Sequence, residues 1–379
     1  MKCKQISGGD MKLVDWSVFS DLDPQLLLLF AGPEQLQDEG WVDALLGRYP
    51  DALLLGCSTA GEIAQTTVNE KSFVLTAVAF DRPSFVSAAV PISDLEDSEA
   101  AGRRLAEALG RTDLDSVLVF APGLNINGSA LIKGMSAALP AGIPITGGLA
   151  GDNGAFHQTW TIYNRQISDR QLVAIGFYGH GIRMHHGSFG GWQPFGPARK
   201  VTRSIANELF ELDGEPALDV YKRYLGDYAT QLPASGLLFP FEMLGEDHSQ
   251  TGLIRTILGV NHDTGSLILA GDIEQHGYLK LMHASTDALI DGAEAAARAA
   301  GEISDSTDSL AILVSCVGRR LVMGARVDEE VEAVAEVFGK KCTQTGFYSY
   351  GEISPFFQSP DCKLHNQTMT ITVLEEACT

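Results

Sequence analysis

The sequence predicts an α/β protein built from two mixed-sheet halves with flanking helices, related by internal duplication. Short apolar runs alternate with amphipathic helical stretches along the 379 residues, which is the pattern of strands and helices in turn. Similar segments then recur in the same order in the second half. Hydrophobic residues make up 45% and charged residues 20% of the chain, so there is enough apolar material for a sizeable core.

The first half is predicted to contain strands separated by helices. The clearest helix covers residues 99–109, because Ala101, Leu105 and Leu109 share one face and Gly110 provides a stop. Two further helices are predicted at residues 36–48 and 129–139. The predicted strands cover residues 26–31, 52–57, 72–80, 85–91, 116–121, 144–148, 158–163 and 171–178.

The second half is predicted to repeat this order. A helix at residues 287–300 is followed by a strand at 309–315, as in the first half. The next helix covers residues 329–338, with Asp328 as its N-cap and Gly339 just past its end.

The closest local match lies in two predicted strands. Gln-Thr-Trp-Thr-Ile at residues 158–162 aligns with Gln-Thr-Met-Thr-Ile at residues 367–371. We expect these strands to superpose under an approximate twofold symmetry. The Gly- and Pro-rich stretch at residues 187–197 breaks any long element and is the predicted junction between the halves.

Glycine-containing turns also recur, each after a predicted strand. Residues 56–63 resemble residues 346–353, and residues 148–152 are a looser relative. Glycine permits a sharp turn, which is one explanation. The other is that the turns line a site where carboxylates and hydroxyls meet a ligand. The ligand-binding candidates are Cys57, Ser58, Glu62, Asp152, Arg183, Trp192, Tyr350 and Glu352.

Charge and cysteine usage limit the partners and the compartment. The chain has 27 basic and 48 acidic residues, for a net charge of −21, so nucleic acid and anionic membranes are not expected partners. The N-terminus lacks the apolar core of a signal peptide, and the strongest apolar run, residues 26–30, is too short to span a bilayer. Six scattered cysteines fit free thiols. We expect a cytoplasmic protein.

Enzyme signatures are mostly absent. The sequence contains no H-E-x-x-H, no Walker phosphate loop, no G-x-S-x-G elbow and no G-x-G-x-x-G after the first strand. Cys57 could be a nucleophile, and Glu62 with Glu352 could be an acid–base pair. A structural thiol and equivalent repeat turns are the simpler explanations. The chain is therefore predicted not to be an enzyme.

Two adjacent histidines are the candidates for a metal ligand. On a strand, His186 shares a face with Ile182 and Met184, whereas His185 lies on the other face. An imidazole beside apolar side chains suits an axial haem ligand, although a hydrogen-bonded histidine would give the same pattern. No C-x-x-C-H motif occurs, so any haem would be non-covalent haem b. His186 is the first choice, and His185 replaces it if the register slips.

Several motifs, in order along the chain, resemble those of the FIST family. The segments are residues 56–63, 147–152, 159–161, 190–203, 214–221, 346–353 and 365–370. The resemblance implies an N-terminal sensory domain at residues 20–190 and a C-terminal domain at residues 191–379. It also implies a small-ligand sensor in signal transduction that acts through a separate signalling protein.

Three functions remain open from the sequence. One subgroup of similar stand-alone proteins binds haem and senses nitric oxide, controlling a histidine kinase, and the histidine pair favours this function. A receptor for a small polar ligand such as an amino acid is the second. An uncharacterised enzyme is the third.

Overall fold

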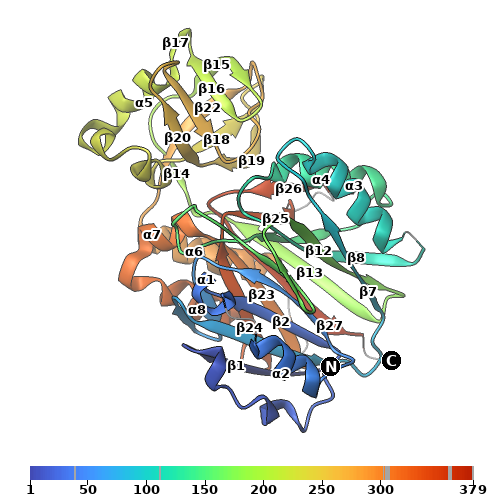
Figure 1. The fold of residues 1–379 in the computed structure, drawn as a ribbon. Helices are drawn as coiled ribbons and strands as arrows, with labels where there is room; N and C mark the ends of the chain where they lie inside the picture. Colours follow the sequence, from blue (N-terminus) through green and yellow to red (C-terminus); the bar gives the residue numbers. More distant parts are fainter. Residues whose placement is uncertain (38–39, 111, 302, 304–307, 357–360, 378–379) are drawn as a thin grey trace.

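The computed structural model describes residues 1–379 except 38–39, 111, 302, 304–307, 357–360 and 378–379. It shows mixed sheets with flanking helices, and the predicted α/β class is confirmed. A main body holds both chain termini, and a smaller domain of residues 193–283 projects from one end of it (Figure 1). Cys378 lies outside the described residues, and the other five cysteines are free thiols.

The main body consists of three six-stranded sheets with the same plan. The first sheet has the order β1 (Lys2–Gly8), β6 (Phe73–Ala79), β2 (Leu26–Ala31), β3 (Leu53–Ser58), β10 (Thr161–Tyr163), β11 (Gln166–Ser168). The second has the order β7 (Phe85–Pro91), β12 (Gln171–Tyr178), β8 (Leu114–Ala121), β9 (Ile145–Leu149), β25 (Gly351–Pro355), β26 (Cys362–His365). The third has the order β13 (Ile182–Phe189), β27 (Met369–Glu376), β23 (Ser309–Cys316), β24 (Cys342–Ser349), β4 (Glu62–Ala64), β5 (Thr67–Asn69).

The repetition therefore goes further than a duplication, since one unit occurs three times. Each unit has a parallel strand pair joined through helical structure, β2–β3, β8–β9 or β23–β24. The short hairpin that follows each pair joins a different unit's sheet: β4–β5 joins the third, β25–β26 the second and β10–β11 the first. This cyclic exchange interlocks the units.

The expected superposition of residues 158–162 and 367–371 is wrong. Thr161–Tyr163 is a hairpin strand that pairs with β3, whereas Met369–Glu376 is a central strand between β13 and β23. The two segments share a local sequence pattern but occupy different positions in the unit. Polar residues precede both strands because both enter a sheet from a turn.

Helices cover the outer faces of the sheets (Figure 1). The main-body helices are α1 (Pro33–Leu36), α2 (Gly40–Arg48), α3 (Ser98–Leu109), α4 (Gly128–Ala138), α6 (Thr286–Ala299), α7 (Val317–Met323) and α8 (Asp328–Phe338). The predicted helices at 99–109, 129–139, 287–300 and 329–338 agree with α3, α4, α6 and α8 within about two residues. A single helix at 36–48 was predicted where α1 and α2 are separate elements.

The three sheets meet in an aromatic core. Phe30, Phe120 and Phe347 come from β2, β8 and β24, one from each sheet. Their ring centroids are 4.8–5.8 Å apart, and all three side chains are fully buried. Close aromatic packing of this kind fills the point where the sheets meet.

The smaller domain is an insertion between β13 and α6. It contains β14 (Gln193–Pro194), β15 (Arg199–Ile205), β16 (Glu208–Leu212), β17 (Glu215–Pro216), α5 (Ala217–Leu225), β18 (Phe241–Leu244), β19 (Gln250–Arg255), β20 (Ile257–Asn261), β21 (Ser266–Leu269) and β22 (Tyr278–His283). Its strands pair antiparallel, and it has its own apolar core. The chain enters it just after residue 190. The domain division predicted at residues 190 and 191 stays a prediction.

In the described part of the chain, no helix combines the length and the apolar character that a bilayer crossing requires.

Candidate functional site

Three equivalent glycines precede the turns that contain most of the predicted ligand-binding residues. Gly56, Gly147 and Gly346 each pair in parallel with the neighbouring strand of their own unit. A Cβ at any of them would lie 1.8–1.9 Å from the partner's main-chain oxygen. Close backbone approach between the paired parallel strands explains these three glycines, and not a sharp turn.

Glu62 and Glu352 hold the start of the next central strand of their units. The Oε2 atom of Glu62 accepts hydrogen bonds from the amide (3.0 Å) and hydroxyl (2.6 Å) of Ser72. The Oε2 atom of Glu352 accepts the same pair from Thr368, at 3.1 and 2.9 Å. Both side chains are fully buried, and burial raises the pKa of Glu62 to about 7 and that of Glu352 to about 8. The two carboxylates lie in different sheets, so the structure does not bring them together.

Asp152, Ser58 and Tyr350 do come together, one from each unit. The hydroxyl of Tyr350 donates to Asp152 Oδ1, and Asp152 Oδ2 accepts from the amide of His157 at 2.6 Å. Ser58 Oγ donates to the carbonyl of Gly151 at 2.8 Å. Burial, followed by the bond to Asp152, raises the pKa of Tyr350. Through these hydrogen bonds, the turn at residues 151–152 contacts Ser58 of the first unit and Tyr350 of the third unit.

The remaining predicted ligand-binding residues lie apart from this cluster. Cys57 is fully buried in the core, and burial raises the pKa of its thiol. Arg183 is exposed on β13, opposite Glu375. Trp192 is buried at the entry to the inserted domain, where Nε1 donates to the carbonyl of Gln367 at 2.7 Å.

The two histidines lie on opposite faces of β13, as predicted. Met184, on the same face as His186, packs against the core of the main body. His186 is half-buried, and burial, followed by the neighbouring His185, lowers the pKa of its imidazole. The His185 side chain is 40% exposed, and its Nε2 lies 3.7 Å from Glu375. In the described part of the chain no group of three or more His, Cys, Asp and Glu side chains is placed to hold a metal ion.

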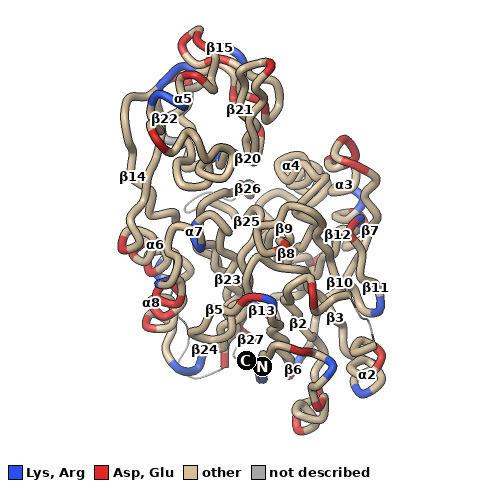
Figure 2. Tube along the Cα trace, turned by 60° about the vertical axis from the view of Figure 1, so that its left-hand side comes forward, with Lys and Arg blue, Asp and Glu red and all other residues tan. Residues whose placement is uncertain are grey.

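A cavity of about 620 Å³ lies between the main body and the inserted domain. Its walls come from α4, from the segment after α4, from β26 and from β19 with the turn at residue 272. Figure 2 shows the inserted domain next to β26 and α4. The lining residues are Ser129, Ile132, Lys133, Ser136, Leu139, Pro140, Ala141, Gly142, Ile143, Leu253, Arg255, Asp272, Asp361, Cys362, Lys363 and Leu364.

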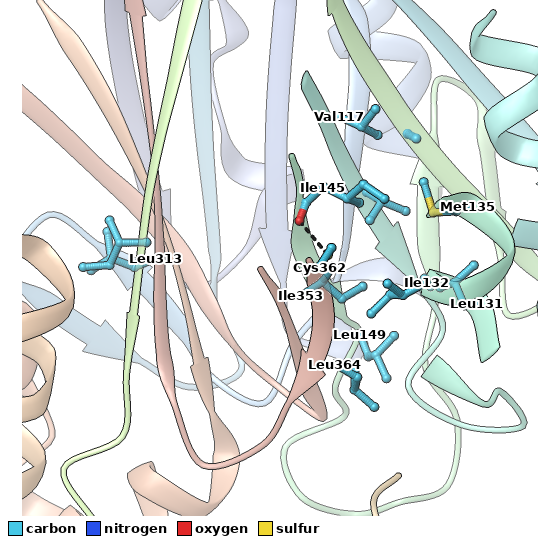
Figure 3. Close-up of a cluster of buried hydrophobic side chains, with 14 of the residues drawn as sticks. Val117, Leu131, Ile132, Met135, Ile145, Leu149, Leu313, Ile353, Cys362 and Leu364 are labelled. Atoms are coloured by element: carbon cyan, nitrogen blue, oxygen red, sulfur yellow. Dashed lines mark hydrogen bonds between the residues drawn. The ribbon is translucent and has the colours of Figure 1, made fainter. Parts of the chain in front are cut away.

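The floor of the cavity is continuous with the apolar core. Ile132, Cys362 and Leu364 line the cavity and pack with the residues drawn in Figure 3. The thiol of Cys362 donates to the carbonyl of Ile145 at 3.0 Å, and burial raises its pKa. The cavity therefore combines an apolar base with charged side chains, which is the usual make-up of a small-ligand site.

Among the described lining residues, Arg255 carries a buried charge and contacts both sides of the cavity. The side chain is 4% exposed. Its Nε donates to the carbonyl of Asp272 at 3.2 Å, and its Nη1 donates to the carbonyls of Ile254 (3.2 Å) and Leu364 (3.1 Å). Leu364 belongs to the main body, so Arg255 bonds across the cleft. Burial lowers the pKa of its guanidinium to about 10.

None of the eight predicted ligand-binding residues lines this cavity. The sequence offered no signal for Arg255, because its bond across the cleft joins it to Leu364, 109 residues further along the chain. A search of motifs within short windows does not find a site that two distant segments form.

The chain thus combines a body of three interlocked units, an inserted domain and a charged cleft between them. The chain belongs to the FIST family: the FIST N domain matches residues 25–215 and the FIST C domain matches residues 217–355. The predicted family is thereby confirmed. FIST domains are small-ligand sensors of signal transduction.

One similar curated protein is an uncharacterized protein, MJ1623, of Methanocaldococcus jannaschii. It is 25% identical over 203 residues, which is 50% of this chain and 38% of that protein. The matched region thus spans well under half of the relative's length.

Among solved structures, the chain is similar to cyanuric acid hydrolase from A. caulinodans. The similarity covers 100% of this chain and 99% of that chain, with a TM-score of 0.36 and 12% identity. That protein is an enzyme, so the prediction that this chain is not an enzyme is corrected and withdrawn. A TM-score this low carries no argument about substrate or chemistry.

Proposed function

We propose that this protein is a receptor for a small polar ligand, such as an amino acid, that binds in the cavity between the main body and the inserted domain. The observation that carries the proposal is a cavity of about 620 Å³ with charged side chains of both signs on its walls. This volume lies within the range of small-molecule sites. Lysine and arginine suit a carboxylate, and Asp272 and Asp361 suit an ammonium group.

The position of the cavity supports a sensory role. A ligand that contacts both the main body and the inserted domain shifts the balance between their arrangements by its difference in affinity for them. A separate signalling protein, such as a histidine kinase, would detect this change. The kinase, the cytoplasmic location and the lack of nucleic-acid binding stay predictions from the sequence.

Filling the cavity is expected to abolish ligand binding. Ser136 and Ala137 are adjacent exposed residues of α4, and only Ser136 lines the cavity. Ser136→Trp should therefore remove the thermal stabilisation that a ligand from a library of small polar metabolites gives the wild type. Ala137→Trp is the matched control and should keep it. A ligand that stabilises both variants equally would place the binding site elsewhere.

Haem binding is a second candidate, supported by one observation. The half-buried imidazole of His186 has a lowered pKa, so it is neutral at pH 7 and chemically suited to iron. However, neither histidine lines the cavity of the cleft or four further cavities of about 410–550 Å³. The histidine pair lies apart from these five cavities, and no mechanism through haem follows.

The haem candidate has a direct test. If the protein binds haem through His186, haem reconstitution of the wild type gives a Soret band that His186→Ala loses. His185→Ala serves as the control and tests the alternative ligand. No haem uptake by the wild type, or equal bands in both variants, would contradict haem binding through this pair.

A further inference from the structure

We infer that the ligand of the cleft carries a carboxylate or similar anionic group, and that Arg255 binds this group. The inference rests on the proposed receptor function and adds the charge of the ligand and the residue that recognises it. It also explains how ligand binding can affect the contact between the main body and the inserted domain, because Arg255 takes part in both.

The first argument is that Arg255 carries a buried charge without a bonded carboxylate among the described residues. Its hydrogen bonds run to three main-chain carbonyl oxygens, which are neutral acceptors. Asp272 raises the pKa of the guanidinium electrostatically, but desolvation by burial outweighs it. A buried cation in this state is stabilised by an anion that enters its site.

The second argument is the surroundings of the guanidinium. Lys133 and Lys363 line the same cavity, in a chain with a net charge of −21. Lys133 also pairs with Glu99 at 2.8 Å outside the lining. The hydroxyl oxygen of Ser129 is buried at this wall and has no hydrogen-bond partner in the described structure. Arg255, the two lysines and the Ser129 hydroxyl can all donate to an anion, although the carboxylates of Asp272 and Asp361 line the same cavity.

The third argument concerns coupling. The Arg255 Nη1 bond to the Leu364 carbonyl joins the inserted domain to β26 of the main body. An anionic ligand accepts hydrogen bonds from the same guanidinium and competes with this carbonyl. Ligand binding and the contact between the two parts are then linked through one side chain.

Gly271 offers a way to move the guanidinium while keeping its charge. A Cβ on Gly271 would lie 2.8 Å from Arg255 Nε and 3.0 Å from Cζ. Gly271→Ala therefore displaces the end of a flexible side chain, which leaves the backbone in place. Arg255→Met removes the charge and keeps much of the apolar stem.

The experiment is calorimetric titration of the full chain with succinate, putrescine and erythritol, as anionic, cationic and neutral probes. We expect succinate to bind the wild type. Arg255→Met should weaken that binding roughly 10- to 100-fold, as loss of a charged hydrogen-bond donor does. Gly271→Ala should weaken it to a smaller extent. The control Arg165→Gln changes a surface arginine that pairs with Asp43 and should bind as the wild type does.

The outcomes separate this inference from the proposed function. In one outcome the wild type binds putrescine or erythritol but not succinate, and Ser136→Trp abolishes that binding. This result would contradict an anionic ligand and would support the receptor function. In another outcome succinate binds and Ser136→Trp abolishes the binding, but Arg255→Met and Gly271→Ala leave it unchanged. This result would contradict the role of Arg255. Absence of binding by all three probes at millimolar concentration counts against both proposals. If Arg255→Met does not fold, Gly271→Ala decides.

Discussion

Gly147→Ala is expected to reduce the free energy of unfolding by about 4 kcal/mol or more. Gly147 has φ +132°, which side chains larger than glycine rarely adopt. Its added Cβ would also lie 1.9 Å from the carbonyl oxygen of Val119. Neither backbone can yield without breaking the parallel pairing of β8 and β9. Urea unfolding followed by circular dichroism measures the change.

Gly259→Ala is the matched control for this substitution. Gly259 also lies in a strand, β20, but its Cβ would meet Ile268 at an ordinary distance of 3.4 Å. The control should unfold within about 1 kcal/mol of the wild type. An unfolding midpoint of Gly147→Ala equal to that of the control would show that the glycine is not required for backbone approach.

Glu330→Gln is expected to destabilise the protein by about 3–5 kcal/mol, because it leaves a buried charge uncompensated. Glu330 and Arg319 are fully buried, with Oε2 and Nη2 2.7 Å apart. The carboxylate also accepts hydrogen bonds from Ser315 Oγ at 3.0 Å and from the Tyr348 hydroxyl. Arg319 in turn donates to the carbonyl of Leu289 in α6 at 2.8 Å. The pair thus joins α6, α7 and α8.

Two further variants make this prediction specific. Arg319→Met combined with Glu330→Leu removes both charges and should destabilise less than Glu330→Gln alone. Glu294→Gln breaks the exposed i,i+4 pair with Arg298 and should cost about 0.5 kcal/mol or less. The idea fails if Glu330→Gln unfolds at the same urea concentration as Glu294→Gln.

Elements with a strong local pattern were predictable from the sequence. The spacing of Ala101, Leu105 and Leu109, with Gly110 after them, predicts helix α3. In the structure this helix ends at Leu109, and Gly110 is its C-cap. The recurrence of the turns near Glu62 and Glu352 was also correct, because both positions need the same backbone path and the same carboxylate contact to the next strand.

The third unit was harder to find in the sequence. Its equivalent turn carries Asp152 one residue closer to the glycine, at Gly147, than Glu62 lies to Gly56 or Glu352 to Gly346. The Asp152 carboxylate binds amides of its own loop. The spacing of glycine and carboxylate in this turn therefore differs from that in the other two units, although its strands pair in the same way.

The sequence by itself determined the α/β class, the main helices, the recurring turns and the family. Each of these depends on residues that are close in the chain, so local periodicity and motif spacing reveal them. Only the tertiary structure decided the exchange of hairpins between sheets and the placement of Arg255 against Leu364. The exchanged hairpins and the Arg255–Leu364 contact join segments more than 100 residues apart, and their pairing follows from how the whole chain packs.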